Sequence, residues 1–479
     1  MTSCGGNMRT VHTFGNGRWR KLKTSVFLRK GAHTRVEYGH PWVFAGEIER
    51  MEGTPEPGAL VDVFRHSGKY VGTGTYSPHS QIRVRIVSRT PVDRLDKSFF
   101  VRRFEQCRRF RERWLPGAES YRAVYGEADF LPGLIVDKFA NVLVVQVLSM
   151  GMEAHRGEIV EALVEVFRPD GIYERSDAGV RQLEGLELRS GPLYGECPRF
   201  VDIDENGLII RVDVAEGQKT GYFLDQRENR AAIAKLMTGW GAKSGIRLQR
   251  METDGGVREV PVNANGKIVT YPYWDGATVL ECFAHTGSFT LHACQYGAKK
   301  VTCLDISEQA IEVAKYNVER NGFLDRVEFV VGDAFEYLRK HAAGLEERRL
   351  RAQAGVRKID TSKPLPKEGR SWDVIILDPP AFAKSKSAVP GALRGYKDIN
   401  LHALKCINDG GYLVTASCSS HVRPDMFLDT IREAAHDAGK ILRLVEFRHA
   451  GKDHPHILGV DEGNYLKFAI FEVRSSQET

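Results

Sequence analysis

The sequence has 479 residues, of which 42% are hydrophobic and 27% charged, and its formal net charge is +6. This length and composition predict a globular protein of two or three domains and exclude a disordered or fibrous chain. No apolar run approaches the ~20 residues that a membrane-spanning helix needs, so we expect a soluble, cytoplasmic protein with no membrane partner.

Positive charge is concentrated toward the amino-terminal end. Residues 1–90 contain 14 Lys/Arg against 6 Asp/Glu. A basic module suits binding to a polyanion, although a solvated basic surface explains the same excess. The eight cysteines form no CxxC pairs, which favours a reducing compartment and argues against structural zinc. The basic, glycine-rich residues 1–23 are predicted to be a disordered tail.

Residues 24–90 contain short β-like runs separated by turn residues, which predicts a small β-barrel. Trp42 and Phe44 stand near basic residues. That mixture suits base stacking and phosphate contact, although a place in the core explains the two rings equally well.

Residues 91–200 predict a compact α+β domain. "KSFFVRRFEQCRRFRERW" (97–114) has helical spacing with a basic face, and "RGEIVEALVEVF" (156–167) is an amphipathic helix. Strands are expected on both sides of a turn at 138–141 and again in "GIYERSD".

From residue 201 to 479, strand-like and helix-like segments alternate. This alternation predicts a doubly wound, mostly parallel sheet whose ligands bind at the carboxyl ends of its strands. Residues 238–276 and 345–370 interrupt the alternation, being polar and rich in glycine or charge. We interpret both as surface insertions or long loops.

The loop after the first of these strands, "LECFAHTGSFT", suggests which cofactor the sheet holds. Gly287 opens the next helix, but neither GxGxxG nor a P-loop is present. Asp305 ends the second strand, where a carboxylate accepts hydrogen bonds from ribose hydroxyls, and Asp333 ends the third, near an expected adenine amine. The set fits an adenosine without pyrophosphate, as in S-adenosyl-L-methionine. NAD is disfavoured by the loop, and each acid alone could simply cap a helix.

"CFAHTGSFT", "DQRENR", "LDPPAFAKSK", "ASCSSH" and "DHP…GNYLKFAIFEV" together resemble the bacterial 23S ribosomal RNA large subunit methyltransferase I family, over about residues 24–479. The resemblance implies an amino-terminal PUA domain, a central domain matched by "RSDAGVRQLEGLE", and a Rossmann-like class I methyltransferase domain. Its implied cofactor is S-adenosyl-L-methionine and its implied product is 5-methylcytosine in 23S rRNA. The stretch 238–276 is longer than the family leads us to expect.

The resemblance also assigns site residues. It implies a cofactor pocket lined by Phe283, His285, Gly287, Asp305, Asp333 and Asp378, with Asp225 and Arg227 bordering its methionine end.

The chemistry of the target atom decides what else the site needs. An exocyclic amine has a lone pair and needs only to be oriented. Carbon 5 of cytosine instead needs a thiolate to add at carbon 6. "GGYLVTASCSSH" is an apolar strand that ends in Cys418, and its end can lie beside that of the strand before Asp378. We therefore predict Cys418 as the nucleophile, the alternative being a small buried hydrophobe.

Asp378 is expected to bind the cytosine edge, and Phe382 to stack on the base beside Pro379 and Pro380. The position after the Asp-Pro-Pro motif is Ala381, where many RNA 5-methylcytosine enzymes have a second cysteine. The base that removes the carbon 5 proton is therefore left open among Lys384, Lys386, His421 and water.

Asp453, His454 and His456 look like metal ligands at first sight, but methyl transfer needs no metal and we expect them to have a loop role. Two other functions stay open. One is a methyltransferase acting on a base nitrogen, for example of guanine in 23S rRNA. The other is a non-catalytic RNA-binding ribosome-assembly factor. A homodimer, and free 23S RNA or an assembly intermediate as substrate, are left open as well.

Overall fold

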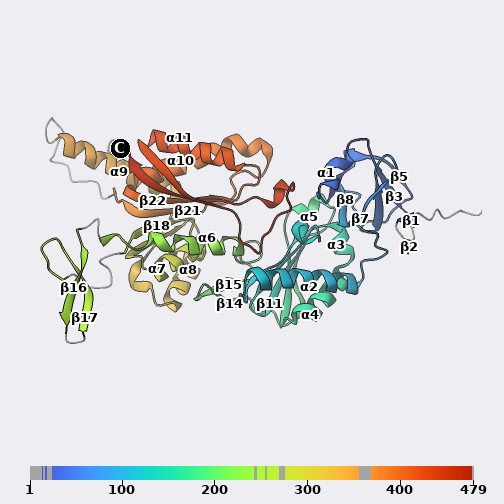
Figure 1. Cartoon of the computed structure of the whole chain (residues 1–479), viewed down its shortest axis with the longest axis horizontal. Helices are drawn as coiled ribbons and strands as arrows, with labels where there is room; N and C mark the ends of the chain where they lie inside the picture. The colour runs from blue at the N-terminus through green and yellow to red at the C-terminus, as the bar shows by residue number, and fades with distance from the viewer. Residues whose placement is uncertain are drawn as a thin grey trace, which may run out of the picture. The chain divides into compact units, whose positions relative to one another are not determined.

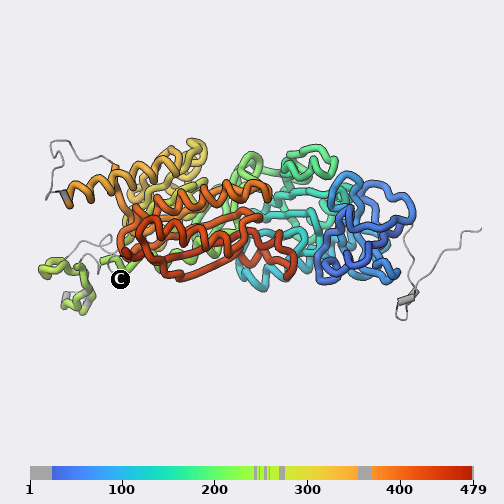
Figure 2. The backbone as a smooth tube through the Cα atoms, turned by 90° about the horizontal axis from the view of Figure 1, so that it is seen from above, coloured from blue at the N-terminus to red at the C-terminus, as the bar shows by residue number. Residues whose placement is uncertain are grey.

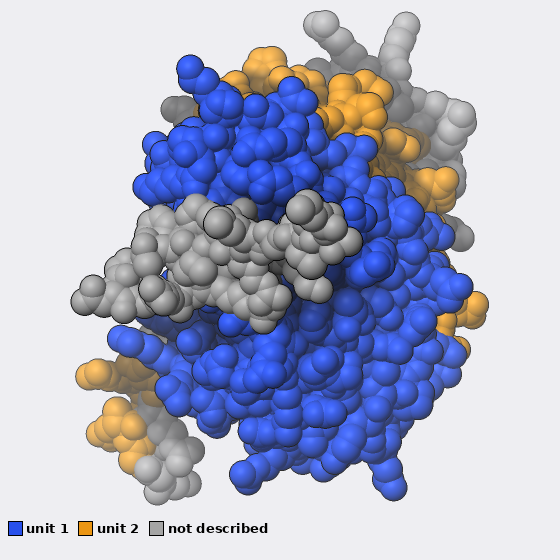
Figure 3. Space-filling model, turned by 90° about the vertical axis from the view of Figure 1, so that its right-hand side faces the viewer, with its two compact units in different colours: residues 1–203, 212–225, 452–463 blue, residues 204–211, 226–451, 464–479 orange. Residues whose placement is uncertain are grey.

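The computed structural model describes residues 13–14, 17–18, 24–241, 245–253, 256–268, 276–354 and 368–476. They form two compact units (Figure 3): unit 1 comprises 1–203, 212–225 and 452–463, and unit 2 comprises 204–211, 226–451 and 464–479. The predicted tail 1–23 lies outside the described residues, except for the paired strands β1 (Thr13–Phe14) and β2 (Gly17–Arg18).

Unit 1 begins with a six-stranded sheet in the order β4-β8-β7-β6-β3-β5. Buried aliphatic side chains from β3, β4, β6, β7 and β8 meet in one core, as expected of a small barrel. The elements are β3 (Ser25–Leu28), α1 (His33–Glu37), β4 (Trp42–Phe44), 3-10 helix η1 (Ala45–Glu47), β5 (Ile48–Glu52), β6 (Leu60–Phe64), β7 (Tyr70–Tyr76) and β8 (Ile82–Ser88).

The second part of unit 1 is a five-stranded sheet in the order β13-β12-β11-β10-β9, with α2 and α4 packed together beside it (Figure 1). Phe99, Phe100 and Phe104 on one face of α2 are buried, as the helical spacing predicts. The elements are α2 (Lys97–Trp114), β9 (Tyr121–Tyr125), η2 (Gly126–Asp129), β10 (Leu134–Phe139), β11 (Val142–Val147), α3 (Met150–Ala154), α4 (Arg156–Phe167), β12 (Gly171–Ser176), α5 (Val180–Leu183) and β13 (Arg189–Gly195).

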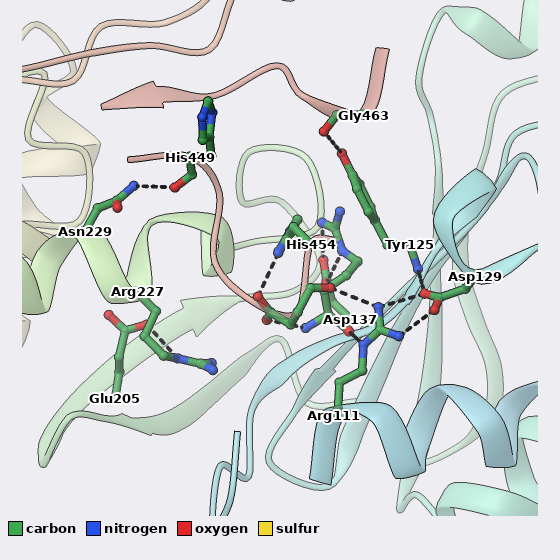
Figure 4. Close-up of polar contacts among 12 residues, drawn as sticks. Arg111, Tyr125, Asp129, Asp137, Glu205, Arg227, Asn229, His449, His454 and Gly463 are labelled. Atoms are coloured by element: carbon green, nitrogen blue, oxygen red, sulfur yellow. Dashed lines mark hydrogen bonds and ion pairs between the residues drawn. The ribbon is translucent and has the colours of Figure 1, made fainter. Parts of the chain in front are cut away.

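A buried polar network holds the segment Lys452–Gly463 within unit 1 (Figure 4). Arg111 donates to both oxygens of Asp129, at 2.6 and 2.7 Å, and to the backbone oxygen of Asp453 at 2.9 Å. The Asp453 carboxylate accepts from the backbone N–H of Arg122 and lies 2.8 Å from Nδ1 of His454. Asp453 and His454 therefore fix this loop in place.

Unit 2 is built on a seven-stranded sheet in the order β20-β19-β18-β21-β22-β24-β23. The five strands from β20 to β22 are parallel, whereas β24 is antiparallel to both of its neighbours. The strands are β18 (Thr278–Cys282), β19 (Lys300–Asp305), β20 (Val327–Val331), β21 (Trp372–Leu377), β22 (Ile407–Ser417), β23 (Lys440–Arg448) and β24 (Lys467–Ser475). This is the predicted doubly wound α/β fold.

Alternating residues of the sheet face two separate cores. Leu280, Ile375 and Leu413 pack on one side with α9, α10 and α11, where α10 lies between the other two helices (Figure 2). Val279 and Val374 pack on the opposite side, with α7. The helices are α6 (Arg227–Ala232), η4 (Ile233–Leu236), α7 (Ser288–Gln295), α8 (Glu308–Arg320), α9 (Ala334–Ala354), α10 (Val389–Lys405) and α11 (Pro424–Asp437).

The two insertions are more regular than loops. Within 238–276 the strands β16 (Arg247–Thr253) and β17 (Gly256–Val262) form an antiparallel hairpin. Within 345–370 helix α9 continues to Ala354, while residues 355–367 lie outside the described residues. The long-loop alternative was wrong where strands and a helix are described, whereas the interpretation of both stretches as surface insertions stays a prediction.

The remaining described elements are short, namely the strands β14 (Phe200–Glu205) and β15 (Leu208–Asp213) and the 3-10 helices η3 (Leu224–Gln226), η6 (Leu324–Arg326), η7 (Lys386–Ala388) and η8 (Asp461–Gly463). Among the described helices, none has both the length and the apolar character required to cross a bilayer.

Candidate active site

The candidate site lies in unit 2, where β18 and β21 run side by side at the centre of the parallel strands. The chain leads from β18 outward to β19 and β20 on one side, and from β21 to β22 on the other. Such a switch point leaves a crevice beyond the carboxyl ends of the strands, which is where ligands bind in this class of sheet.

The loop after β18 has an unusual backbone. Phe283 and His285 have positive φ angles of 62° and 47°, which residues with large side chains rarely adopt. Gly287 has a φ of 76°, and a Cβ added there would lie 3.0 Å from Cβ of Ala314 on α8. The loop thus turns tightly into α7, and a side chain at Gly287 would press against Ala314.

Asp305, at the end of β19, holds this loop. One carboxylate oxygen accepts from the backbone N–H of His285 at 2.8 Å, and the other from the backbone N–H of Ser307 at 2.9 Å. Each oxygen keeps a further lone pair for an outside donor such as a ribose hydroxyl. Burial lowers the pKa of His285 below its ordinary value despite the nearby carboxylate, so its imidazole is neutral.

Asp333 caps α9, because its carboxylate accepts from the backbone N–H of Glu336 at 2.9 Å. Capping was the alternative explanation for this acid, and the structure shows that it applies. Asp305 instead lies before the residue that caps α8, which is Ser307.

Sequence reasoning missed Glu281, a fully buried acid in β18. Its carboxylate accepts from the backbone N–H groups of Phe289 and Thr290 and from the Thr290 hydroxyl, at the start of α7. Burial raises the pKa of Glu281 to about 8, with a small contribution from Asp378. An acidic residue within the apolar run "TVLEC" was the available signal.

Asp378 directly follows β21 and accepts a hydrogen bond from Nε2 of Gln226 at 2.9 Å. Oε1 of Gln226 accepts in turn from Asn229 at 2.7 Å, which orients the amide. The "DQRENR" segment therefore reaches Asp378 through its buried glutamine, which was not among the predicted site residues.

Cys418 lies beside the Asp-Pro-Pro loop, as the strand order predicts. Leu377 of β21 pairs with Thr415 of β22, and the Cys418 thiol lies 3.7 Å from the backbone oxygen of Pro379. Cys418 is half-buried, whereas five of the other described cysteines are buried.

Ser419 joins the same two loops. Its hydroxyl accepts from the backbone N–H of Ala383 at 3.1 Å and lies 3.0 Å from the hydroxyl of Tyr396. The loop that carries Cys418 is therefore fixed against the Asp-Pro-Pro loop on both sides.

The aromatic ring of Phe382 is half-buried and packs 4.6 Å from the ring of Tyr396 and 6.0 Å from that of Phe335. Phe335 also lies edge-on to Phe283. An aromatic cluster therefore lines the loops that follow β18 and β21. Pro379 is buried and Pro380 is exposed.

Lys467, at the start of β24, is a second residue that sequence reasoning missed. Its side chain is 1% exposed, and its Nζ donates to the backbone oxygens of Ser419 and Tyr465, both at 2.7 Å. Burial lowers the pKa of Lys467 to about 8. A lysine beside the apolar run "FAIFEV" was its only signal in the sequence.

Of the two residues predicted at the methionine end, Asp225 belongs to unit 1 and Arg227 to unit 2, and both are buried. Arg227 lies 3.7 Å from the carboxylate of Glu205 (Figure 4). The same carboxylate accepts two hydrogen bonds from Arg230. Burial opposes ionisation of Glu205, but Arg230 outweighs it and the pKa lies below its usual range. Lys384 and Lys386 are exposed, and His421 is half-buried.

Comparison with known proteins decides the family. The model of a PUA-like domain matches residues 26–89, and that of a methyltransferase domain matches residues 279–344. Ribosomal RNA large subunit methyltransferase I of Escherichia coli O1:K1 is 37% identical over 451 residues, covering 93% of this chain and 98% of that protein. The same-named protein of Klebsiella pneumoniae (strain 342) is 38% identical, covering 92% and 96%. The chain belongs to the ribosomal RNA large subunit methyltransferase I family.

Two solved structures share the fold. A putative S-adenosylmethionine-dependent methyltransferase from Streptococcus mutans aligns with a TM-score of 0.69 at 19% identity, over 94% of this chain and 99% of that one. A putative methyltransferase, SMU.776, solved in complex with SAH, aligns with a TM-score of 0.70 at 19% identity, over the same shares. The predicted fold class, a methyltransferase domain with an amino-terminal PUA-like domain, and the cofactor S-adenosyl-L-methionine are confirmed.

Proposed function

We propose that this methyltransferase forms 5-methylcytosine in 23S rRNA through a covalent adduct with Cys418. The observation that carries the proposal is the position of the half-buried Cys418 thiol. It lies 3.7 Å from the backbone oxygen of Pro379, which belongs to the loop that follows Asp378. A methyltransferase acting on a base nitrogen needs Asp378 and the prolines but has no use for this thiol.

The cofactor pocket in this proposal is the crevice beyond β18 and β19. Asp305 keeps acceptor capacity for ribose hydroxyls, and the tight turn at Gly287 brings backbone close to a bound adenosine. Phe283, His285 and Asp333 flank it, and Asp225 and Arg227 are proposed at its methionine end. When bound, the cofactor supplies an electrophilic methyl group.

In the proposed reaction the Cys418 thiolate bonds to carbon 6 of cytosine, and the π electron pair of the carbon 5–carbon 6 double bond moves to carbon 5. Carbon 5 takes the methyl group as the bond from that group to the sulfonium sulfur breaks, and the sulfur keeps the bonding pair. A base then removes the carbon 5 proton, the double bond re-forms and the bond from sulfur to carbon 6 breaks. Asp378 binds the polar edge of the base, whose ring lies beside Pro379, Pro380 and Phe382.

The Cys418→Ala variant tests this mechanism. We expect turnover to fall by roughly a thousandfold or more, because the carbon 5 position is not nucleophilic without the adduct. Binding of S-adenosyl-L-methionine, measured by calorimetry, should not change. Cys197→Ala, at a half-buried cysteine in unit 1, is the matched control. Full activity of Cys418→Ala, with a methylated nitrogen in the product by mass spectrometry, would favour the alternative function.

We further propose that the RNA docks on unit 1, in a cleft of about 540 Å³ between the barrel and α2. Tyr38 and Phe130 line it and are 79% and 54% exposed. Phe130 has a φ of 59°, a costly conformation for an aromatic residue that points to a functional reason for its position. Trp42 instead donates from Nε1 to Glu127 at 2.9 Å, so its polar edge is used within the fold.

Two arginines, Arg89 and Arg103, line this cleft together with one acid, Glu37, whose carboxylate pairs with Arg65. Arg89 donates to the backbone oxygen of His40 at 3.1 Å, and Arg103 to that of Val87 at 3.0 Å. Neither makes an ion pair with a carboxylate of the described residues, and burial lowers the pKa of both guanidinium groups. Exposed rings beside cations without a carboxylate partner suit a single-stranded segment of RNA, whose bases stack and whose phosphates bind.

The double variant Arg89→Ala/Arg103→Ala tests the cleft. Affinity for a 23S rRNA transcript should fall, and the slope of log affinity against log salt should decrease by about one for each lost phosphate contact. The control is Arg109→Ala. Arg109 is exposed on α2, the helix that also carries Arg103, and its side chain pairs with Glu105. An unchanged salt slope in the double variant would remove the cleft from the proposal. A cytoplasmic location is part of the same proposal.

A further inference from the structure

Lys467 places a buried cation next to the loop that carries Cys418. Its Cα pairs with that of Ser417 across β24 and β22, and its Nζ donates to the backbone oxygen of Ser419. The Lys467 ammonium, on β24, is thus hydrogen-bonded to Ser419, the residue after the cysteine. The neighbouring strand β22 ends at Ser417, one residue before Cys418.

Burying an ammonium group is expensive unless a carboxylate compensates its charge. The two acceptors of Lys467 are uncharged backbone oxygens, and no carboxylate in the described part of the chain lies within ion-pair distance of it. Burial lowers the pKa of Lys467 only to about 8, so the group stays charged at neutral pH. Joining the backbone of Ser419 to that of Tyr465 does not require this charge, because a neutral hydrogen-bond donor would make the same two bonds.

We propose that Lys467 is a positioning residue whose ammonium stabilises the thiolate form of Cys418. The inference rests on the proposed role of Cys418 as nucleophile. The thiol proton leaves to solvent while Lys467 keeps its own three protons, so the step is an ordinary acid dissociation next to a fixed positive charge. A thiolate, not a thiol, is the form that attacks carbon, and nearby cations favour it.

Other groups around Cys418 do not supply this charge. Tyr396 contacts Ser419 from α10, and burial raises the pKa of Tyr396, so it stays a neutral phenol. Asp378, at the end of β21, is an acid and disfavours a second negative charge nearby. His421 follows three residues after the cysteine and is half-buried. Lys467 is the buried cation that the structure shows hydrogen-bonded to the loop of Cys418.

The test measures the chemistry of the thiol without RNA or cofactor. Full-length protein is alkylated with iodoacetamide between pH 6 and 10, and the Cys418 peptide is quantified by mass spectrometry. In Lys467→Met the midpoint of the pH profile should move up by about one unit, so that alkylation at pH 7 is roughly tenfold slower. Lys467→Arg keeps the charge and should restore most of the rate. Lys340→Met, at an exposed lysine on α9, should leave the profile unchanged.

An unchanged pH midpoint in folded Lys467→Met, whatever its turnover, would overturn the inference. Lys467 would then serve only to hold two segments together by hydrogen bonds. If Lys467→Met does not fold, the Arg variant decides, since a shifted midpoint there contradicts a role of charge. The result is independent of methyl transfer. Activity of Cys418→Ala would refute the proposed adduct, while the alkylation profile would still report whether Lys467 acts on the thiol.

Discussion

The two halves of the sheet end in sites of different construction. Beyond β18 and β19, the side chain of Asp305 binds backbone N–H groups, and the loop takes three positive φ angles. Beyond β21 and β22, the contacts are made by side chains. Gln226 donates to Asp378, the Ser419 hydroxyl accepts from the backbone N–H of Ala383, and Lys467 donates to the backbone oxygen of Ser419. The first site is therefore formed mainly by the conformation of the backbone, and the second mainly by the functional groups of side chains.

The difference teaches where each half is vulnerable. A site formed by the backbone tolerates most side-chain substitutions. The exceptions are a glycine whose conformation the turn requires and a side chain that accepts hydrogen bonds from the backbone N–H groups. A set of chemical groups loses function with each group removed, while the fold persists. We therefore expect substitutions beyond β18 to change cofactor affinity and stability, and substitutions beyond β21 to change turnover.

After Cys418→Ala, the largest effect on turnover should come from Asp378→Asn. The amide oxygen still accepts from Gln226, so the loop keeps its shape, but the carboxylate charge that we propose binds the base is lost. We expect turnover to fall roughly a hundredfold or more, with the affinity for S-adenosyl-L-methionine little changed by calorimetry. Asp429→Asn, on the exposed face of α11, is the control. A loss of cofactor affinity as large as the loss of turnover would show that the two halves are not separable.

An intermediate effect is expected for Gly287→Ala. The new Cβ meets Ala314 at 3.0 Å in a backbone with positive φ, which should cost about 1–2 kcal/mol of stability. Cofactor affinity should fall about tenfold, while turnover at saturating cofactor is kept. Gly322→Ala is a matched control, because Gly322 has the same φ of 76° and nothing within 4 Å. Equal losses of cofactor affinity in both variants would show that the contact with Ala314 is irrelevant.

The smallest effect on cofactor binding and turnover should come from Glu281→Gln, which we expect to change stability alone. Since burial raises the pKa of Glu281 to about 8, the folded protein binds a proton that the unfolded chain releases near pH 4.5. This group therefore stabilises the fold less as pH rises from about 5 to 8. Glu281→Gln removes that dependence, so its stability relative to wild type should rise by the order of 3 kcal/mol across the same range. Urea unfolding at pH 5.5 and pH 8 measures the difference, and a difference that does not vary with pH would contradict it.

Much of this site was predictable because parallel strands in alternation with helices bring their carboxyl ends to one edge. That rule alone predicts that Cys418 lies beside the Asp-Pro-Pro loop, although the two are about forty residues apart in sequence. The roles assigned to Cys418, Asp378 and the cofactor residues stay predictions. The capping role of Asp333 was an expected alternative, because an acid just before a helix can accept a hydrogen bond from a backbone N–H group of the first turn.

What the sequence could not predict depends on register and on long-range pairing. Gln226 donates to Asp378, and nothing in the local sequence singles out this glutamine, because the orientation of a short helix decides where its side chain points. Lys467 reaches the cysteine loop because β24 runs antiparallel between β22 and β23. The polar stretch around β16 and β17 has no apolar alternation strong enough to indicate a hairpin.

The position of β24 has a consequence for the order in which the site is completed during synthesis. The ribosome makes β22 and β23 before β24, yet the finished sheet has β24 between them. A nascent chain that already contains Asp378 and Cys418 therefore lacks both the central partner of β22 and the lysine beside the thiol. Because domains generally fold as units once their elements are available, Cys418 acquires its neighbouring lysine only after β24 has been made, so a shorter nascent chain has the proposed nucleophile without the proposed cation beside it.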